Sequence, residues 1–365
     1  YVPEVMTSFR ELARTNCVEF LAETYSHSLS SLISEKEFIR QVKEHSDAIK
    51  KYFGVEPTAF RNTELIYSDQ IGITVAAMGY TTMLTEGAKH ILGWKSPNFV
   101  YTNAANPRLR LLLKNFNLSD DIAFRFSDRG NPNWPITSEK YAVWLRESVK
   151  DSDIINLFMD YETFGEHQSQ SSGILEFMRS LPNAVFKETS LVFRTPSEAV
   201  SIHQPVAPLH VPFAISWADE ERDTSAWLGN ELQNEAFHKL YALEEEVMRS
   251  ENAGLIRDFM KLQESDHFYY MCTKFFSDGA VHKYFNPYDT PYEAFINYMN
   301  VISDFQIRVK KSTAKAQPAQ KTENSVKESV TKRPATKVAN NAKRAGSPSN
   351  KAGKLSKATV VKKRK

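Results

Sequence analysis

Two acidic residues follow apolar, strand-like segments and could act together. Glu64 comes just after residues 58–61, and Asp160 directly follows the apolar run 154–159. In parallel α/β architectures the loops after the strands converge on one face, so we expect both carboxylates there. Such a pair can cleave a glycosidic bond, because one carboxyl protonates the leaving oxygen while the other attacks or stabilises the oxocarbenium ion. With 44 acidic residues in the chain, each is also open to a plainer role as a solvated surface charge or a helix cap.

The elements around these residues follow an α/β pattern. Short apolar runs alternate with amphipathic stretches through the first two thirds of the chain, which predicts a mostly parallel sheet whose strands are each followed by a helix. Ser34 and Glu37 form a capping box at one helix start, and Gly54 marks its end. We expect strands over residues 17–21, 58–61, 80–84, 99–101 and 154–159, and further helices over residues 69–78, after Asn106-Pro107 and over 138–149.

The pattern changes after residue 224. Apolar residues recur at helical spacing over residues 227–248, 253–276 and 292–309, with a loop rich in Gly, Pro, Asn and Asp between the last two. This periodicity predicts a helical bundle packed on the α/β part. We therefore expect a catalytic α/β portion over residues 1–220, a helical bundle over 221–309 and a tail over 310–365.

The tail differs in composition from the rest of the chain. It holds 17 basic and 2 acidic residues, a formal charge of +15, whereas the remainder carries −13 and all the aromatic residues. Such a segment cannot bury enough apolar surface to offset its ordering entropy, so we expect disorder. Its lysines could bind a polyanion, such as nucleic acid or an acidic surface, by counterion release. A solubilising tether without a partner is the competing interpretation.

Composition also excludes several classes of protein. No apolar stretch is long enough for a membrane span. The two cysteines, Cys17 and Cys272, lie in apolar surroundings and are expected to be core residues, not a disulfide or metal site. Nothing in the sequence requires an oxidising compartment, and we expect a cytoplasmic protein. HExxH and comparable metal-binding spacings are absent, so no metal or other cofactor is expected.

Five segments in order along residues 1–309 together resemble the motif blocks of glycoside hydrolase family 57, in its α-amylase branch. They are CVEFLAETYSHSL, FRNTELIYSDQIG, MDYETFGEHQ, SWADEERDTSAWLGN and ESDHFYYM. The resemblance implies an incomplete (β/α)7 barrel, a helical C-terminal region and a retaining mechanism on α-glucans without a catalytic metal. It also implies that Glu64 is the nucleophile and Asp160 the general acid/base.

The sequence departs from the family pattern at its start. Family members begin with a strand that ends in a His-Gln-Pro block, and nothing before Cys17 matches it. The same three letters at His203-Gln204-Pro205 follow the acid/base block in a loop-like stretch, which we interpret as coincidence. We therefore expect that the first βα unit of the barrel is missing.

Further residues of the matching blocks are candidate sugar ligands. Glu19 and His27 could contact a hydroxyl, although a buried, satisfied polar pair is an equal alternative. Trp217 could stack its indole on a pyranose while Asp219 accepts hydroxyls, the alternative being a core tryptophan.

Residues of the last block and those beside Asp160 complete the predicted set. Asp266 and His267, reached from the helical region, could close one end of the cleft. Glu162 and His167 are expected to support Asp160 through hydrogen bonds.

The function predicted from these residues is α-amylase-like hydrolysis of α-1,4-glucans, with an α-glucan polysaccharide or a maltooligosaccharide as substrate. Glucan transfer of the 4-α-glucanotransferase or branching type on the same site is an alternative, because water and a second sugar compete for one glycosyl-enzyme. A non-catalytic glucan-binding protein with a polyanion-binding tail is another.

Overall fold

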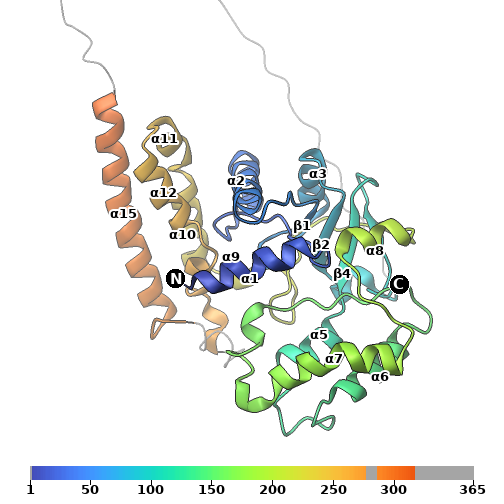
Figure 1. The fold of residues 1–365 in the computed structure, drawn as a ribbon. Helices are drawn as coiled ribbons and strands as arrows, with labels where there is room; N and C mark the ends of the chain where they lie inside the picture. Colours follow the sequence, from blue (N-terminus) through green and yellow to red (C-terminus); the bar gives the residue numbers. More distant parts are fainter. Residues whose placement is uncertain (1, 277–285, 317–365) are drawn as a thin grey trace, which may run out of the picture. The chain divides into compact units, whose positions relative to one another are not determined.

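The strands form one five-stranded mixed sheet in an α/β fold. The computed structural model describes residues 2–276 and 286–316 of the chain (Figure 1). The sheet order is β1-β2-β4-β3-β5. β1, β2 and β4 are parallel, β3 runs antiparallel to β4, and β5 is parallel to β3. The strands are β1 (Ala59–Arg61), β2 (Thr82–Glu86), β3 (Tyr101–Asn103), β4 (Arg110–Lys114) and β5 (Ala207–Leu209).

The register places three charged side chains on one face of the sheet. Arg61 pairs with Leu84, and Glu86 pairs with Lys114. Because side chains alternate along a strand, Arg61, Glu86 and Lys114 share the face of Leu84. Leu84 packs there in a small apolar cluster that includes Phe158. The carboxyl ends of β1, β2 and β4 therefore present charged groups toward the segment that leads to Asp160.

Helix α2 (Glu35–Phe53) forms where the sequence predicts it. The Ser34 hydroxyl accepts a hydrogen bond from the backbone N–H of Glu37 at 3.2 Å, and Gly54 ends the helix in the left-handed conformation with φ 74°. Its apolar side chains Phe38 and Val42 are buried in the main core. The other helices of this part are α1 (Pro3–Arg14), α3 (Asp69–Ala77), α4 (Lys89–Leu92), α5 (Phe116–Ala123), α6 (Ser138–Ser148), α7 (Ile174–Glu188) and α8 (Pro196–Ile202).

Helices α5, α6 and α7 group together (Figure 1) and share an apolar core of their own, which includes Leu118, Tyr141 and Phe177. Short 3₁₀ helices connect the longer elements. They are η1 (Ser30–Leu32), η2 (Thr63–Leu65), η3 (Tyr161–Thr163), η4 (Gln170–Ser172) and η5 (Thr273–Phe276).

The C-terminal region is helical, as expected. Its residues Trp227, Phe259 and Phe305 belong to the same buried cluster as Phe60 and Tyr67 of the sheet region, so bundle and sheet share one core. The stretch 227–248 is not a single helix, because the helix is interrupted near Gly229 and again after Tyr241. The helices are α9 (Ser225–Leu228), α10 (Glu231–Tyr241), α11 (Glu244–Arg249), α12 (Ala253–Leu262), α13 (Asp266–Tyr269) and α15 (Pro291–Ala316).

Two expected strands are absent from the sheet. Residues 154–159 belong to no strand. The carbonyl of Asn156 accepts a hydrogen bond from the backbone N–H of Asn115 at 2.9 Å, and the Asn156 amide donates to the carbonyl of Leu113 at 3.0 Å, so the contact with β4 is partly made by a side chain and forms no ladder. The pairing expected for residues 17–21 is confined to Ala22, which forms an isolated parallel bridge with Phe60. These two strand predictions were wrong.

The helix expected after Asn106-Pro107 is a turn. Asn106 accepts a hydrogen bond from the backbone N–H of Leu109 at 3.1 Å, and the chain returns as β4, antiparallel to β3. Asn and Pro favour turns as strongly as they favour helix starts, which explains the error.

Several other expectations concern the ends of the chain and its cysteines. Helix α15 continues to Ala316, so residues 310–316, assigned to the tail, are helical. The rest of the tail lies outside the described residues, as does most of the expected loop before α15. Cys17 is exposed, contrary to expectation, and Cys272 is buried. Among the described residues, no helix combines the length and apolar character of a membrane span.

Candidate active site

One cleft gathers most of the predicted site residues. It has a volume of about 1240 Å³ and lies at the carboxyl ends of β2 and β4, against the loops that follow β1 and β5 and against the helical region. Glu19 and His267 do not line it. The predicted residues that line it are His27, Glu64, Asp160, Glu162, His167, Trp217, Asp219 and Asp266.

Glu64 is held in an unusual backbone conformation. It lies in η2 just after β1 with φ 56° and ψ 25°, in the left-handed region. A non-glycine residue there costs about 1–3 kcal/mol, and such strain is found mainly at functional sites. The segment after it pairs with the SWAD block, because Tyr67 and Ile215 form an antiparallel bridge and the Trp217 N–H donates to the Glu64 carbonyl at 3.2 Å.

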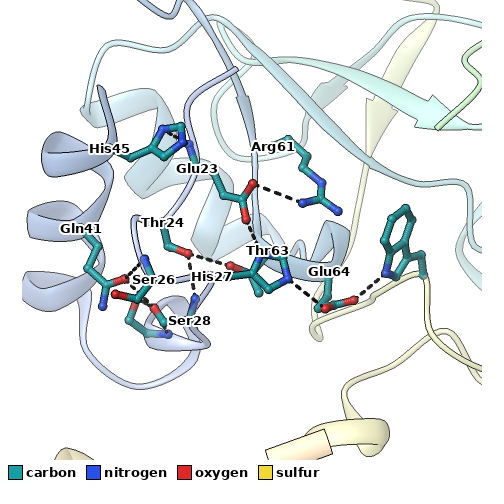
Figure 2. A network of polar contacts seen from close by, with 12 residues as sticks. Glu23, Thr24, Ser26, His27, Ser28, Gln41, His45, Arg61, Thr63 and Glu64 are labelled. Carbon is teal, nitrogen blue, oxygen red and sulfur yellow. Dashed lines mark hydrogen bonds and ion pairs between the residues drawn. The ribbon is translucent and has the colours of Figure 1, made fainter. Parts of the chain in front are cut away.

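The Glu64 carboxylate accepts two hydrogen bonds. His27 Nε2 lies 3.0 Å from Oε1 (Figure 2). The indole Nε1 of Trp217 donates to Oε2 at 2.7 Å. Burial alone would raise the pKa of Glu64, but the hydrogen bonds from His27 and Trp217 and the charges of His27 and Arg61 outweigh it and lower the pKa. The carboxylate is therefore ionised at neutral pH.

His27 lies between two carboxylates. Its Nδ1 is 2.5 Å from Glu23 Oε1, on the side opposite Glu64 (Figure 2). Burial would lower the pKa of His27, but the hydrogen bonds and negative charges of Glu23 and Glu64 raise it to about 10. The ring is thus an imidazolium that donates from both nitrogens. Arg61 Nη1, 3.3 Å from Glu23 Oε2, adds a second positive charge to the group.

Asp160 has the opposite electrostatic setting. It follows residues 154–159, immediately before η3, and lines the cleft. Desolvation raises the pKa of Asp160, and the negative charges of Glu64 and Glu162 raise it further, while Arg61 and His167 lower it in part. The two carboxyls of the cleft therefore have pKa values that are shifted apart.

Sequence reasoning missed three residues of this site. Glu23, not Glu19, is the carboxylate beside His27, and it lies four residues before it in the same block. Arg61 stands three residues before Glu64, and its positive charge acts to lower the pKa of Glu23, Glu64 and Asp160. Lys114 ends β4, a strand that the sequence analysis did not predict.

Glu19 and His267 make their contacts away from the cleft. The Glu19 carboxylate accepts from the backbone N–H of Ser197 at 2.8 Å and from its hydroxyl at 2.5 Å, at the N-terminus of α8. The His267 ring stacks on Tyr298 with centroids 5.0 Å apart and contacts the carbonyl of Lys261. Neither side chain is brought to the predicted sugar site.

The remaining predicted residues line the cleft around Glu64. Asp266 is close enough to Glu64 for that charge to add to desolvation in raising its pKa. Asp219 forms an ion pair with Lys274 at 3.2 Å. Glu162 is exposed and acts on Asp160 through its charge, and no described hydrogen bond joins the two side chains.

Backbone strain and ligand chemistry distinguish this cleft further. Non-glycine residues with φ near +50° recur in its lining at His27, Glu64, Asp219 and Arg222. Among the described residues, no group of three or more His, Cys, Asp or Glu side chains is arranged to hold a metal ion. The arrangement fits acid–base and nucleophilic chemistry by paired carboxylates.

Comparisons with known proteins agree with this chemistry. The model of glycosyl hydrolase family 57 matches residues 1–212. A protein of Methanocaldococcus jannaschii named "Putative alpha-amylase" is 41% identical over 324 residues, which cover 86% of this chain and 68% of the relative. The chain belongs to glycosyl hydrolase family 57.

Solved structures of family 57 enzymes share the fold. The branching enzyme of Pyrococcus horikoshii has a TM-score of 0.63 at 14% identity, covering 87% of this chain and 70% of that one. The branching enzyme of Thermococcus kodakaraensis has a TM-score of 0.60 at 15% identity, covering 85% and 69%. The 4-alpha-glucanotransferase of Thermococcus litoralis has a TM-score of 0.54 at 15% identity, covering 73% and 46%. Membership of family 57 thus extends from sequence to fold, and the chain is a glycoside hydrolase.

Proposed function

We propose that this family 57 chain hydrolyses α-1,4-glucans with retention of configuration, using Glu64 as nucleophile and Asp160 as general acid/base. The observation that carries the proposal is the pair of carboxyls in one cleft whose pKa values are shifted in opposite directions. Groups whose environments separate their pKa values in this way divide the work of attack and protonation. The similarity to a protein named as an alpha-amylase supports the choice of substrate.

The first step forms a glycosyl-enzyme. Glu64, ionised and held by His27 and Trp217, attacks the anomeric carbon while Asp160 donates its proton to the glycosidic oxygen. The raised pKa of Asp160 keeps that proton available at the pH at which Glu64 is already ionised. The leaving sugar departs with the proton.

The second step releases the product. Asp160, now ionised, accepts a proton from an incoming water, which attacks the anomeric carbon and regenerates the Glu64 carboxylate. Because the charge of Glu64 raises the pKa of Asp160, the negative charge that returns to Glu64 favours reprotonation of Asp160. The net configuration is retained after two inversions.

The size of the cleft bears on whether water or a second glucan accepts the glycosyl group. Its volume of about 1240 Å³ exceeds the ~300–1,000 Å³ of most small-ligand pockets, so it can hold several glucosyl units on a maltooligosaccharide or polysaccharide. A second glucan bound beside the glycosyl-enzyme can replace water as acceptor. Glucan transfer on the same site is therefore the second candidate, favoured also by the fold shared with branching and glucanotransferase enzymes.

We infer further that the sheet is part of the incomplete (β/α)7 barrel implied by the family resemblance. Leu84 and Leu112 of the sheet pack with Leu21 and Phe158, apolar residues of the two segments that sequence analysis assigned to strands, which supports a common interior.

The missing first βα unit, the boundary after residue 220 and a cytoplasmic location stay predictions. Polyanion binding by the tail is likewise a proposal, supported by its charge of +15; salt-sensitive retention on heparin that persists after truncation at Ala316 would refute it.

One variant and one measurement on the wild-type enzyme test the main proposal. Glu64→Gln should abolish turnover of a maltooligosaccharide, because no glycosyl-enzyme forms without the carboxylate nucleophile. Proton NMR of the first product released by the wild-type enzyme should show the α-anomer. Turnover by Glu64→Gln, or a β-anomer as first product, contradicts the proposal. Products longer than the substrate, formed by transfer to a second glucan at high substrate concentration, would favour the glucanotransferase alternative.

A further inference from the structure

Trp217 is bound to Glu64 through two separate groups. Its backbone N–H donates to the Glu64 carbonyl at 3.2 Å, and its indole Nε1–H donates to the Glu64 carboxylate at 2.7 Å. One residue therefore restrains both the strained backbone of Glu64 and the direction of its side chain. The antiparallel bridge between Tyr67 and Ile215 fixes the spacing of the two segments that carry them.

Two cations lie over the Trp217 ring. The guanidinium carbon of Arg61 is 5.0 Å from the ring centroid, and Lys114 Nζ is 5.1 Å from it. Arg61 ends β1 and Lys114 ends β4, with β2 between them in the sheet. Contacts of this kind are attractive, and they are strongest where water is excluded.

These cations are themselves anchored. The Lys114 side chain is only 4% exposed and donates to Asp120 at 3.1 Å, and its register neighbour is the buried Glu86. Arg61 is paired with Glu23 at 3.3 Å. A cation that is fixed by a buried ion pair cannot leave the ring without stranding its partner, which is costly. A pyranose that stacked on a ring face occupied by either cation would have to displace it.

We propose that Trp217 is a positioning residue for the nucleophile Glu64, and not the sugar-stacking platform that its sequence context suggests. The proposal rests on the proposed function, in which Glu64 attacks the anomeric carbon. Arg61 and Lys114 hold the indole in place, and the indole N–H directs one carboxylate oxygen while His27 directs the other. Trp217 thus acts on catalysis through Glu64, mainly in kcat, and contributes little to substrate affinity.

Removal of the indole N–H at constant shape separates the two roles. Replacing Trp217 by 3-benzothienylalanine keeps the bicyclic ring and exchanges the N–H for sulfur, and Trp217→Phe is the natural counterpart. We expect kcat to fall about 10- to 100-fold, as for a lost hydrogen bond to a charged group, with KM within about twofold of wild type. The acid limb of kcat/KM should move to higher pH, because Glu64 loses a hydrogen bond that favours its ionised form.

Matched controls make the outcome decisive. Trp94→Phe is the control substitution, because Trp94 is 93% exposed and does not line the cleft, and it should leave kcat, KM and the pH profile unchanged. Thermal unfolding of each variant verifies that it is folded. A benzothienyl variant with wild-type kcat and pH profile, or one altered in KM alone, overturns the proposal. Glu64→Gln, measured in parallel, distinguishes failure of the proposed function from failure of the role proposed for Trp217. If Glu64→Gln still turns over substrate, the proposed function fails. If Glu64→Gln is inactive and the benzothienyl variant behaves like the wild type, only the role of Trp217 is overturned.

Discussion

Glu23 and Glu64 bind opposite nitrogens of one imidazole, that of His27, at 2.5 Å and 3.0 Å. The positive charge on His27 is therefore stabilised from both sides, and it in turn favours the ionised form of Glu64. Arg61 contributes a second positive charge to the same group (Figure 2). The nucleophile proposed here thus depends on Glu23, a carboxylate that does not line the cleft.

Glu23→Gln tests this dependence. The substitution keeps the side-chain volume and a hydrogen-bonding oxygen but removes the charge opposite Glu64, so the imidazolium is less favoured and less firmly oriented. We expect kcat to fall about 10-fold, equivalent to roughly 1.4 kcal/mol of a hydrogen bond between charged groups, with little change in KM. Steady-state kinetics on a maltooligosaccharide measure this. A variant with wild-type kcat would show that Glu23 has no part in positioning His27.

Glu19→Gln is the matched change on the neighbouring carboxylate. Glu19 binds the N-terminus of α8 through Ser197, so its loss should lower the free energy of unfolding by about 1 kcal/mol, as for other caps, without altering kcat or KM. Urea unfolding and kinetics on the same preparation compare the two effects. A raised KM with unchanged stability would instead support the sugar contact that the sequence predicts for Glu19.

The comparison of Glu19 with Glu23 shows where sequence reasoning ends. Both residues stand in one motif block. His27 adopts the left-handed conformation with φ 47° and binds Glu23, and neither feature is visible in the composition. Glu64 and Asp160 could be predicted because each follows an apolar run, even though the run before Asp160 proved not to be a strand.

The cations near Trp217 were beyond prediction for another reason. Lys114 belongs to β4, which follows an Asn-Pro turn that also matches a helix start, so the strand and its terminal lysine went unrecognised. Arg61 was visible beside Glu64, but its neighbours come from distant parts of the chain, at Glu23 and Trp217. Local patterns place residues at strand ends, and long-range packing decides which of them meet.

Glu86 predicts an unusual dependence of stability on pH. Burial raises the pKa of Glu86 to about 7, although Lys114, Arg222 and the backbone N–H of Gly87 partly oppose this; the negative charge of Asp120 adds to it. The folded chain therefore binds more protons than the unfolded chain between pH 4.5 and about 7, so the free energy of unfolding falls as the pH rises through this window.

Glu86→Gln should remove this fall in the free energy of unfolding with rising pH. The variant mimics the protonated carboxyl, so it should match the wild type at pH 4.5 and exceed it at pH 8 by an amount up to roughly 3 kcal/mol, the limit that a shift of this size sets. Urea unfolding at both pH values gives the difference between the variants. Equal stability at pH 8, or a variant that is weaker only at pH 8, would mean that ionised Glu86 is compensated in the folded chain.

Asp160→Asn separates the two chemical steps of the proposed mechanism. Cleavage of a maltooligosaccharide needs a proton on the leaving oxygen, so kcat/KM should fall about 10²- to 10⁴-fold. With α-maltosyl fluoride, whose leaving group needs no proton, Glu64 can still form the glycosyl-enzyme, and kcat/KM should fall far less. The alkaline limb of the wild-type pH profile, which reports deprotonation of Asp160, should disappear for the fluoride in the variant. Equal losses on both substrates would assign Asp160 to binding and not to proton transfer.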